Sequence, residues 1–113
     1  MFNTEKYEVL FTGVDSMKFN LSEVSHNWRL AAYKVYRELG LYIGALFAEA
    51  MVVCDDPNNF ERTIVAALIR NPISEPNADH FYGVLQQVVN LTSYMTGNIR
   101  VNMIRTAVEV NLK

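Results

Sequence analysis

The amino-acid sequence predicts an all-α protein, a bundle of four to five helices around one long central helix. Three observations lead to this prediction. Residues 39–54 are apolar almost throughout. A helix-capping sequence stands upstream of them at residues 20–23. Apolar residues also recur at helical spacing in the segments that follow. We expect residues 1–113 to form a single α-helical domain, because this length suits one hydrophobic core.

The N-terminal segment, residues 3–12, fits either of two elements. Tyr7, Val9 and Phe11 alternate as in a β-strand, whereas the spacing of Tyr7, Phe11 and Val14 also fits one face of a short helix. We favour the helix, because no other segment offers a convincing partner strand.

The central helix is predicted to run from Asn20 to Val53. Asn20 can cap it by accepting a hydrogen bond from the backbone amide of Glu23. The first half is amphipathic, with an apolar side made of Val24, Trp28, Ala31, Ala32 and Val35. In the second half Gly40 is expected to kink or interrupt the helix, since glycine costs about 1 kcal/mol relative to alanine in a helix interior.

Three further helices are predicted, at residues 57–70, 77–96 and 98–111. For the last of them, the spacing of Val101, Ile104 and Val108 favours a helix. The alternation of Ile99, Val101 and Met103 leaves a strand open at residues 99–112.

A stripe of small residues in the central helix is the predicted interaction site. Gly40, Gly44 and Ala48 recur every four residues, so on a helix they share one face without side-chain bulk. A second backbone can approach such a face closely. We therefore expect these three residues to contact another helix, either within the chain or in a second copy of it.

The composition favours self-association. Half of the residues are hydrophobic and only 19% are charged, which is a high apolar content for a small monomer. The predicted partners are a second copy of the chain and another protein. A net charge of −2 and a pI near 5.6 make nucleic acid an improbable partner and argue against binding to anionic membranes.

The chain carries a single cysteine, Cys54, so no internal disulfide can form. This cysteine usage fits a reducing compartment, and we expect a cytoplasmic protein. The apolar run from Leu39 to Val53 is shorter than the roughly 20 residues of a membrane-spanning helix and contains Glu49.

Glu49 is the one charge in the apolar run and the candidate for a buried charge. Three interpretations are open. It can reach water at the helix edge, form a buried structural pair, or act as a catalytic acid. The possible cationic partners are Arg62, Arg70, Arg100 and Arg105. The edge position is favoured and the buried pair comes second. The catalytic acid comes last, because the sequence places no second carboxylate or histidine to work with Glu49.

Basic and aromatic residues alternate in the first half of the central helix, at Arg29, Tyr33, Lys34 and Arg37. Such residues can stack on bases and bind phosphates. On a helix, however, we expect them to point in different directions beside Glu38. A solvated helix face is therefore the favoured interpretation, and a nucleic-acid-binding surface is the alternative.

No recognised catalytic, cofactor or metal motif stands in the sequence. Glycine-rich phosphate loops and the nucleophile elbow are absent, and His26 and His80 lack metal-ligand spacing. We therefore predict no cofactor, no metal and no enzymatic activity. The predicted function is that of an interaction or assembly protein, such as a regulator, inhibitor, adaptor or structural subunit.

Two alternatives stay open beside this prediction. The first is a small nucleic-acid-binding regulator, and the remote one is a small helical enzyme or ligand binder centred on Glu49. The asparagine-rich composition also suits a phage or mobile-element protein.

Overall fold

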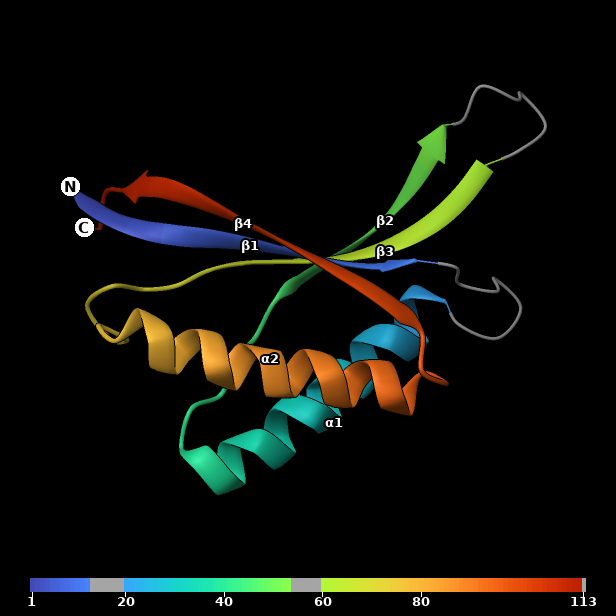
Figure 1. Cartoon of the computed structure of the whole chain (residues 1–113), viewed down its shortest axis with the longest axis horizontal. Coiled ribbons are helices and arrows are strands. Elements are labelled where there is room, and N and C mark those ends of the chain that lie inside the picture. The colour runs from blue at the N-terminus through green and yellow to red at the C-terminus, as the bar shows by residue number, and fades with distance from the viewer. Residues whose placement is uncertain (13–19, 54–59, 113) are drawn as a thin grey trace.

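A computed structural model describes residues 1–12, 20–53 and 60–112 of the chain (Figure 1). The described residues form an α+β fold, a four-stranded antiparallel sheet with two helices. In chain order the elements are β1 (Phe2–Thr12), α1 (Leu21–Leu39), β2 (Leu46–Val53), β3 (Phe60–Ile69), α2 (Ala78–Met95) and β4 (Arg100–Val110). The predicted all-α bundle is therefore wrong.

The sheet has the strand order β2-β3-β1-β4, and each neighbouring pair is antiparallel. β1 lies inside the sheet, where Tyr7 is paired with Leu68 of β3 on one side and with Arg105 of β4 on the other. A β-α-β-β-α-β chain with this order has the ferredoxin-like topology. Because many functions use this topology, the fold alone does not decide what the protein does.

The predicted central helix ends fourteen residues early, at Leu39 instead of Val53. Its start is confirmed, since the Asn20 side chain accepts a hydrogen bond from the Glu23 amide at 2.9 Å. Gly40 ends the helix in the left-handed region, with φ +76°, and its N–H donates to the Tyr36 carbonyl at 2.7 Å. Glycine adopts this conformation without the cost that a side chain would impose.

The apolar run beyond Gly40 enters the sheet as β2 instead of continuing the helix. β2 pairs with β3, so two of the predicted helical segments stabilise each other as a hairpin. A short apolar run fits a strand as well as a helix, and pairing between distant residues decides the outcome. The helices predicted at residues 57–70 and 98–111 are wrong for the same reason, since residues 60–69 and 100–110 form β3 and β4, while residues 57–59 lie outside the described residues.

The strand alternatives at both ends of the chain are confirmed. Residues 2–12 form β1, and the alternation at residues 99–103 continues into β4. The two segments pair with each other along their whole length, from Phe2 with Val110 to Thr12 with Arg100. Each strand lacked a convincing partner in the sequence only because its partner lies about a hundred residues away.

The fourth predicted helix is confirmed as α2. The side chain of Asn77 caps it by accepting a hydrogen bond from the His80 amide at 3.0 Å. Gly97 and Asn98 have positive φ angles and separate α2 from β4.

Both helices cover the same face of the sheet, as Figure 1 shows. The core lies between the layers, where Tyr7, Val9 and Phe11 of β1 meet Trp28 of α1 and Leu85 of α2. All five predicted inward residues of α1 are buried. Among the described residues, no helix is long and apolar enough to cross a membrane.

We call the opposite face of the sheet the bare face, because neither helix of the described residues covers it (Figure 1). By the strand register its side chains include the apolar residues Leu10, Leu46, Ala48, Val65, Ala67, Ile69 and Ile104. Leu46, Ile69 and Ile104 are each about half exposed or more. An apolar sheet face of this kind is typical of a contact surface.

Candidate functional site

A groove lies between the N-terminal half of α1 and the segment that leads into β2. It has a volume of about 440 Å³, within the roughly 300–1,000 Å³ that small-molecule sites occupy. We call it the α1–β2 groove. Its lining residues are Ser22, Ser25, His26, Trp28, Arg29, Tyr42, Gly44, Ala45 and Phe47.

Trp28 holds residues 40–45, which form one wall of the groove, against α1. Its indole N–H donates to the Ile43 carbonyl at 3.0 Å, which ties residues 40–45 to α1. Its ring meets Phe47 edge to face at 5.5 Å and Phe11 at 6.4 Å between centroids. Tyr42 in the same segment is 45% exposed, so its ring is open to a ligand. The groove therefore combines an aromatic wall with hydroxyl, imidazole and guanidinium groups.

Glu49 lies two residues beyond Phe47, on the same face of β2. Its carboxylate is 3.5 Å from the Arg62 guanidinium of β3, and both side chains are more than two-fifths exposed. Glu49 is thus exposed, as the favoured interpretation expected, but on a strand and not at a helix edge, and the buried pair is not formed. One of the four suggested cations, Arg62, is its partner.

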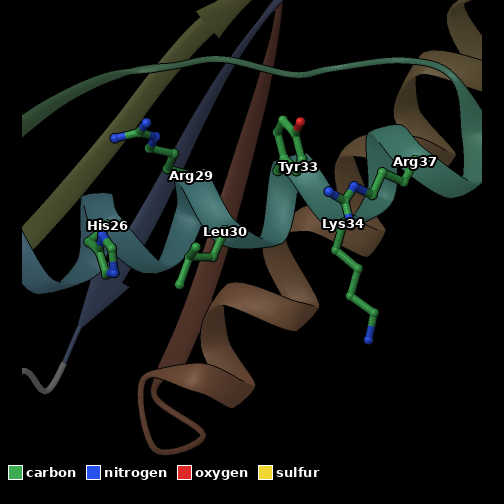
Figure 2. Close-up of a pocket in the computed structure, with 6 residues that line it drawn as sticks. All are labelled: His26, Arg29, Leu30, Tyr33, Lys34 and Arg37. Atoms are coloured by element: carbon green, nitrogen blue, oxygen red, sulfur yellow. The ribbon is translucent and has the colours of Figure 1, made fainter.

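A second groove runs along the outer side of α1 and has a volume of about 660 Å³. Figure 2 shows its lining side chains, all projecting from α1: His26, Arg29, Leu30, Tyr33, Lys34 and Arg37. We call it the outer groove. Arg29, Tyr33, Lys34 and Arg37 were expected to point in different directions. All four line this one groove, although Figure 2 shows Arg29 and Tyr33 extending to one side of α1 and Lys34 to the other.

A cluster of charged residues links β1 to both of its neighbouring strands, β3 and β4. Glu5 accepts hydrogen bonds from Arg70 at 2.7 and 3.3 Å and lies 3.4 Å from the Arg105 guanidinium. Arg70 is nearly buried and also donates to the Glu75 carbonyl at 2.6 Å. The Arg105 guanidinium lies over the Tyr7 ring, 5.8 Å from its centroid. With every cation facing a partner, this cluster is a structural clamp.

The clamp shifts the ionisation of its members. The hydrogen bond from Arg70 holds the pKa of Glu5 below its usual 4.5, against the opposing effect of burial. The same contact raises the pKa of Arg70. Burial raises the pKa of the Tyr7 hydroxyl.

We expect the clamp to weaken in acid. Since the pKa of Glu5 is lower in the folded than in the unfolded chain, its contribution is complete above about pH 4.5 and is lost as the pH falls through the folded-state pKa. Urea unfolding between about pH 6 and pH 3 checks this. The difference in free energy of unfolding between the wild type and Glu5→Gln should shrink towards the acid end. A difference that stays constant would contradict the prediction.

The predicted small-residue stripe does not exist as a helical face. Gly40 caps α1, Gly44 lies in the segment before β2, and Ala48 lies within β2. The three residues fall in three different backbone settings, because the helix ends at Gly40. Gly44 lines the α1–β2 groove, and Ala48 lies on the bare face. Whether any of them contacts a partner stays a prediction.

Comparison with protein families decides between the functional classes. The model of the SAM lyase family matches residues 2–112, which is nearly the whole chain. The chain belongs to the SAM lyase family. The family comprises enzymes that cleave S-adenosylmethionine and is of the phage anti-restriction type. No curated protein matches the chain.

Membership of the SAM lyase family overturns the predicted non-enzymatic function. The prediction of an assembly protein without enzymatic activity is wrong, and so is the alternative of a nucleic-acid-binding regulator. The remote alternative of a small enzyme is closer to the finding, although the protein is α+β and not helical. The prediction failed because the chain carries none of the short motifs by which common catalytic sites are found in a sequence.

Several residues of the α1–β2 groove were missed as candidates in the SAM lyase sequence. Tyr42 and Phe47 fell in the run taken for a buried helix, and Trp28 was assigned to the core alone. The available signal was a pair of aromatic residues, Tyr42 and Phe47, on either side of the small residues Gly44 and Ala45. Among the described residues, no group of histidine, cysteine, aspartate or glutamate is placed to hold a metal ion.

Proposed function

We propose that this protein cleaves S-adenosylmethionine and binds it in the α1–β2 groove, with Glu49 at one end. One observation carries the proposal: Phe47 lines an aromatic groove of suitable volume, and Glu49 follows Phe47 by two residues on the same face of β2. The position of the substrate rests on this geometry, and the reaction rests on the family.

The chemistry of the groove suits the parts of this substrate. S-adenosylmethionine joins an adenosine group to a methionine chain through a positively charged sulfonium. The exposed ring of Tyr42 and the edge of Phe47 offer apolar surface to adenosine. The guanidinium of Arg29 can bind the substrate carboxylate, and the Glu49 carboxylate attracts the cationic sulfonium and ammonium groups.

The lyase step itself needs no water. An oxygen of the substrate's own carboxylate bonds to the carbon of the methionine chain that carries sulfur, as the carbon–sulfur bond breaks. The electron pair of the broken bond stays on sulfur, so the products are a lactone and a neutral thioether of adenosine. The leaving group is therefore already activated by its own charge. What the protein must supply is a fixed substrate conformation, which the wall held by Trp28 and Ile43 provides.

The assay follows S-adenosylmethionine by liquid chromatography and mass spectrometry with the purified, full-length chain. We expect the substrate to disappear and a thioether of adenosine to accumulate. Tyr42→Ala should raise KM about tenfold, as expected when one aromatic contact is lost. Tyr94→Ala is the matched control, because Tyr94 is 69% exposed on α2 and touches neither groove. An equal effect of both variants would contradict the position of the substrate.

We also propose that the protein self-associates through the bare face of its sheet. Leu46, Ile69 and Ile104 expose apolar surface there, next to an exposed Lys6–Glu8 ion pair at 4.0 Å. Covering this face in a second copy removes apolar area from water. Ala48 lies on the same face, so the interaction predicted for it is retained in a different geometry. Another protein as a partner stays a prediction.

Light scattering after size exclusion at micromolar concentration tests self-association. We expect the wild type to be larger than a monomer and Ile69→Glu to lower the mass, because the new charge would be buried without a partner. Tyr94→Glu places the same charge on the helical side and should leave the mass unchanged. A monomeric wild type would contradict the proposal.

A cytoplasmic location is proposed as well. It rests on the single cysteine, which fits a reducing compartment. Fractionation of cells that express the tagged chain checks it, and recovery outside the cytoplasm would contradict it.

A further inference from the structure

The outer groove of α1 concentrates positive charge on an acidic protein. Its six lining residues include Arg29, Lys34 and Arg37, the titratable His26, and no carboxylate. The chain as a whole carries a net charge of −2. Figure 2 shows that these side chains project from consecutive turns of one helix. The groove is thus a local cationic surface, and charge complementarity selects an anion for it.

Two carboxylates limit the length of this cationic surface. Glu23 precedes it and Glu38 follows it on α1, and both are exposed. From Arg29 to Arg37 the helix rises by about 12 Å, at 1.5 Å per residue. A compact anion fits between the two carboxylates. A long polyanion that followed the helix would meet negative charge at both ends.

Aromatic rings accompany the cations. The Arg37 guanidinium lies over the Tyr33 ring, 4.9 Å from its centroid. The Tyr33 and Tyr36 rings are 6.4 Å apart, and those of Tyr36 and Tyr42 are 6.3 Å apart. All three tyrosines are about half exposed. Exposed tyrosine and arginine planes side by side are a surface on which a planar base can stack.

We propose that the outer groove binds a nucleoside triphosphate, with its phosphates on Arg29, Lys34 and Arg37 and its base against Tyr33. The volume of about 660 Å³ is suitable for a ligand of this size. The site adjoins the proposed substrate site, because His26 and Arg29 line both grooves. Tyr33, Lys34 and Arg37 line the outer groove and not the α1–β2 groove.

Calorimetric titration of the purified protein in low salt tests the proposal. The probes are adenosine, AMP, ADP and ATP, without added metal. We expect the affinity to rise with each phosphate and to fall steeply as salt is added. Equal affinity for adenosine and ATP would overturn the proposal. Tighter binding of a single-stranded oligonucleotide than of ATP, increasing with its length, would also overturn it in favour of nucleic acid.

Three variants locate the binding site. Arg37→Gln and Lys34→Gln should each weaken ATP binding about fivefold, the effect of one exposed charge pair. Lys6→Gln removes one positive charge from the bare face and should leave ATP binding unchanged. If all three variants weaken ATP binding equally, the effect is one of overall charge and the proposal fails.

Tyr42→Ala separates this site from the substrate groove. Tyr42 lines the α1–β2 groove and not the outer groove. We expect this variant to retain ATP binding while it loses affinity for S-adenosylmethionine. Loss of ATP binding in Tyr42→Ala but not in Arg37→Gln would place the nucleotide in the substrate groove and overturn the proposal. Failure of the substrate assay alone would leave the ATP result standing.

Discussion

Glu49→Gln is expected to lower kcat/KM for S-adenosylmethionine by about a hundredfold, equal to roughly 2.7 kcal/mol. Glutamine keeps the size of the side chain but removes the charge that faces the cationic substrate. The fold should be unaffected, since the Glu49–Arg62 pair is exposed and such pairs contribute at most about 1 kcal/mol. Steady-state kinetics and thermal unfolding of the same samples separate the two effects.

Glu8→Gln is the matched control for this variant. Glu8 is also a strand glutamate with an exposed ion pair, but it lies on the bare face, away from the α1–β2 groove. We expect it to keep wild-type kinetics. If Glu49→Gln keeps them too, Glu49 has no part in substrate binding and the proposed site must be revised.

Arg70→Ala should destabilise the fold by about 3–5 kcal/mol, the usual cost of removing one partner from a buried ion pair. The side chains of Arg70 and Glu5 are only 7% and 17% exposed. Loss of the guanidinium leaves the Glu5 carboxylate facing Arg105 alone and frees the Glu75 carbonyl. Urea unfolding near neutral pH measures the change.

Arg62→Ala provides the comparison, because Arg62 lies within β3 and Arg70 directly follows the end of this strand. Arg62 and Arg70 each pair with a glutamate on a neighbouring strand, but the Arg62 pair is exposed. We expect a loss of less than about 1 kcal/mol for Arg62→Ala. Similar losses in the two variants would mean that burial does not set the strength of these pairs.

The helices were predictable where local signals are strong. Asn20 and Asn77 cap α1 and α2 through side-chain hydrogen bonds that the sequence pattern indicates directly. The inward residues of α1, such as Val24 and Trp28, follow from helical spacing alone. These features involve residues at most a few positions apart.

The strands were not predictable in the same way. β1 pairs with β4 across about a hundred residues, and no local pattern reports such a contact. β2 was taken for helix because its apolar run has no polar side. Gly40 was weighed as a kink, whereas its left-handed conformation ends the helix altogether. An apolar run of this length has no intrinsic preference for helix or strand that outweighs the effect of pairing with another strand.

The candidate site was not predictable either, because it too depends on contacts between segments that are distant in the sequence. The α1–β2 groove forms only because residues 40–45 turn back along α1, where Trp28 holds Ile43. Glu49 was singled out as the unusual charge of the apolar run, but its position beside Phe47 on one sheet face follows from strand geometry. The enzyme class came from the family match and from no single residue.

The central position of β1 bears on how the chain is made. Its two hydrogen-bonding neighbours are residues 60–69 and residues 100–110. During synthesis, β1 leaves the ribosome first but waits for its last neighbour until residue 110 has been translated. The sheet can therefore close only after residue 110 has been translated, and contacts so distant in sequence slow folding. Until then β1 can pair only with β3, and its other edge presents unpaired backbone N–H and C=O groups to which another chain can pair.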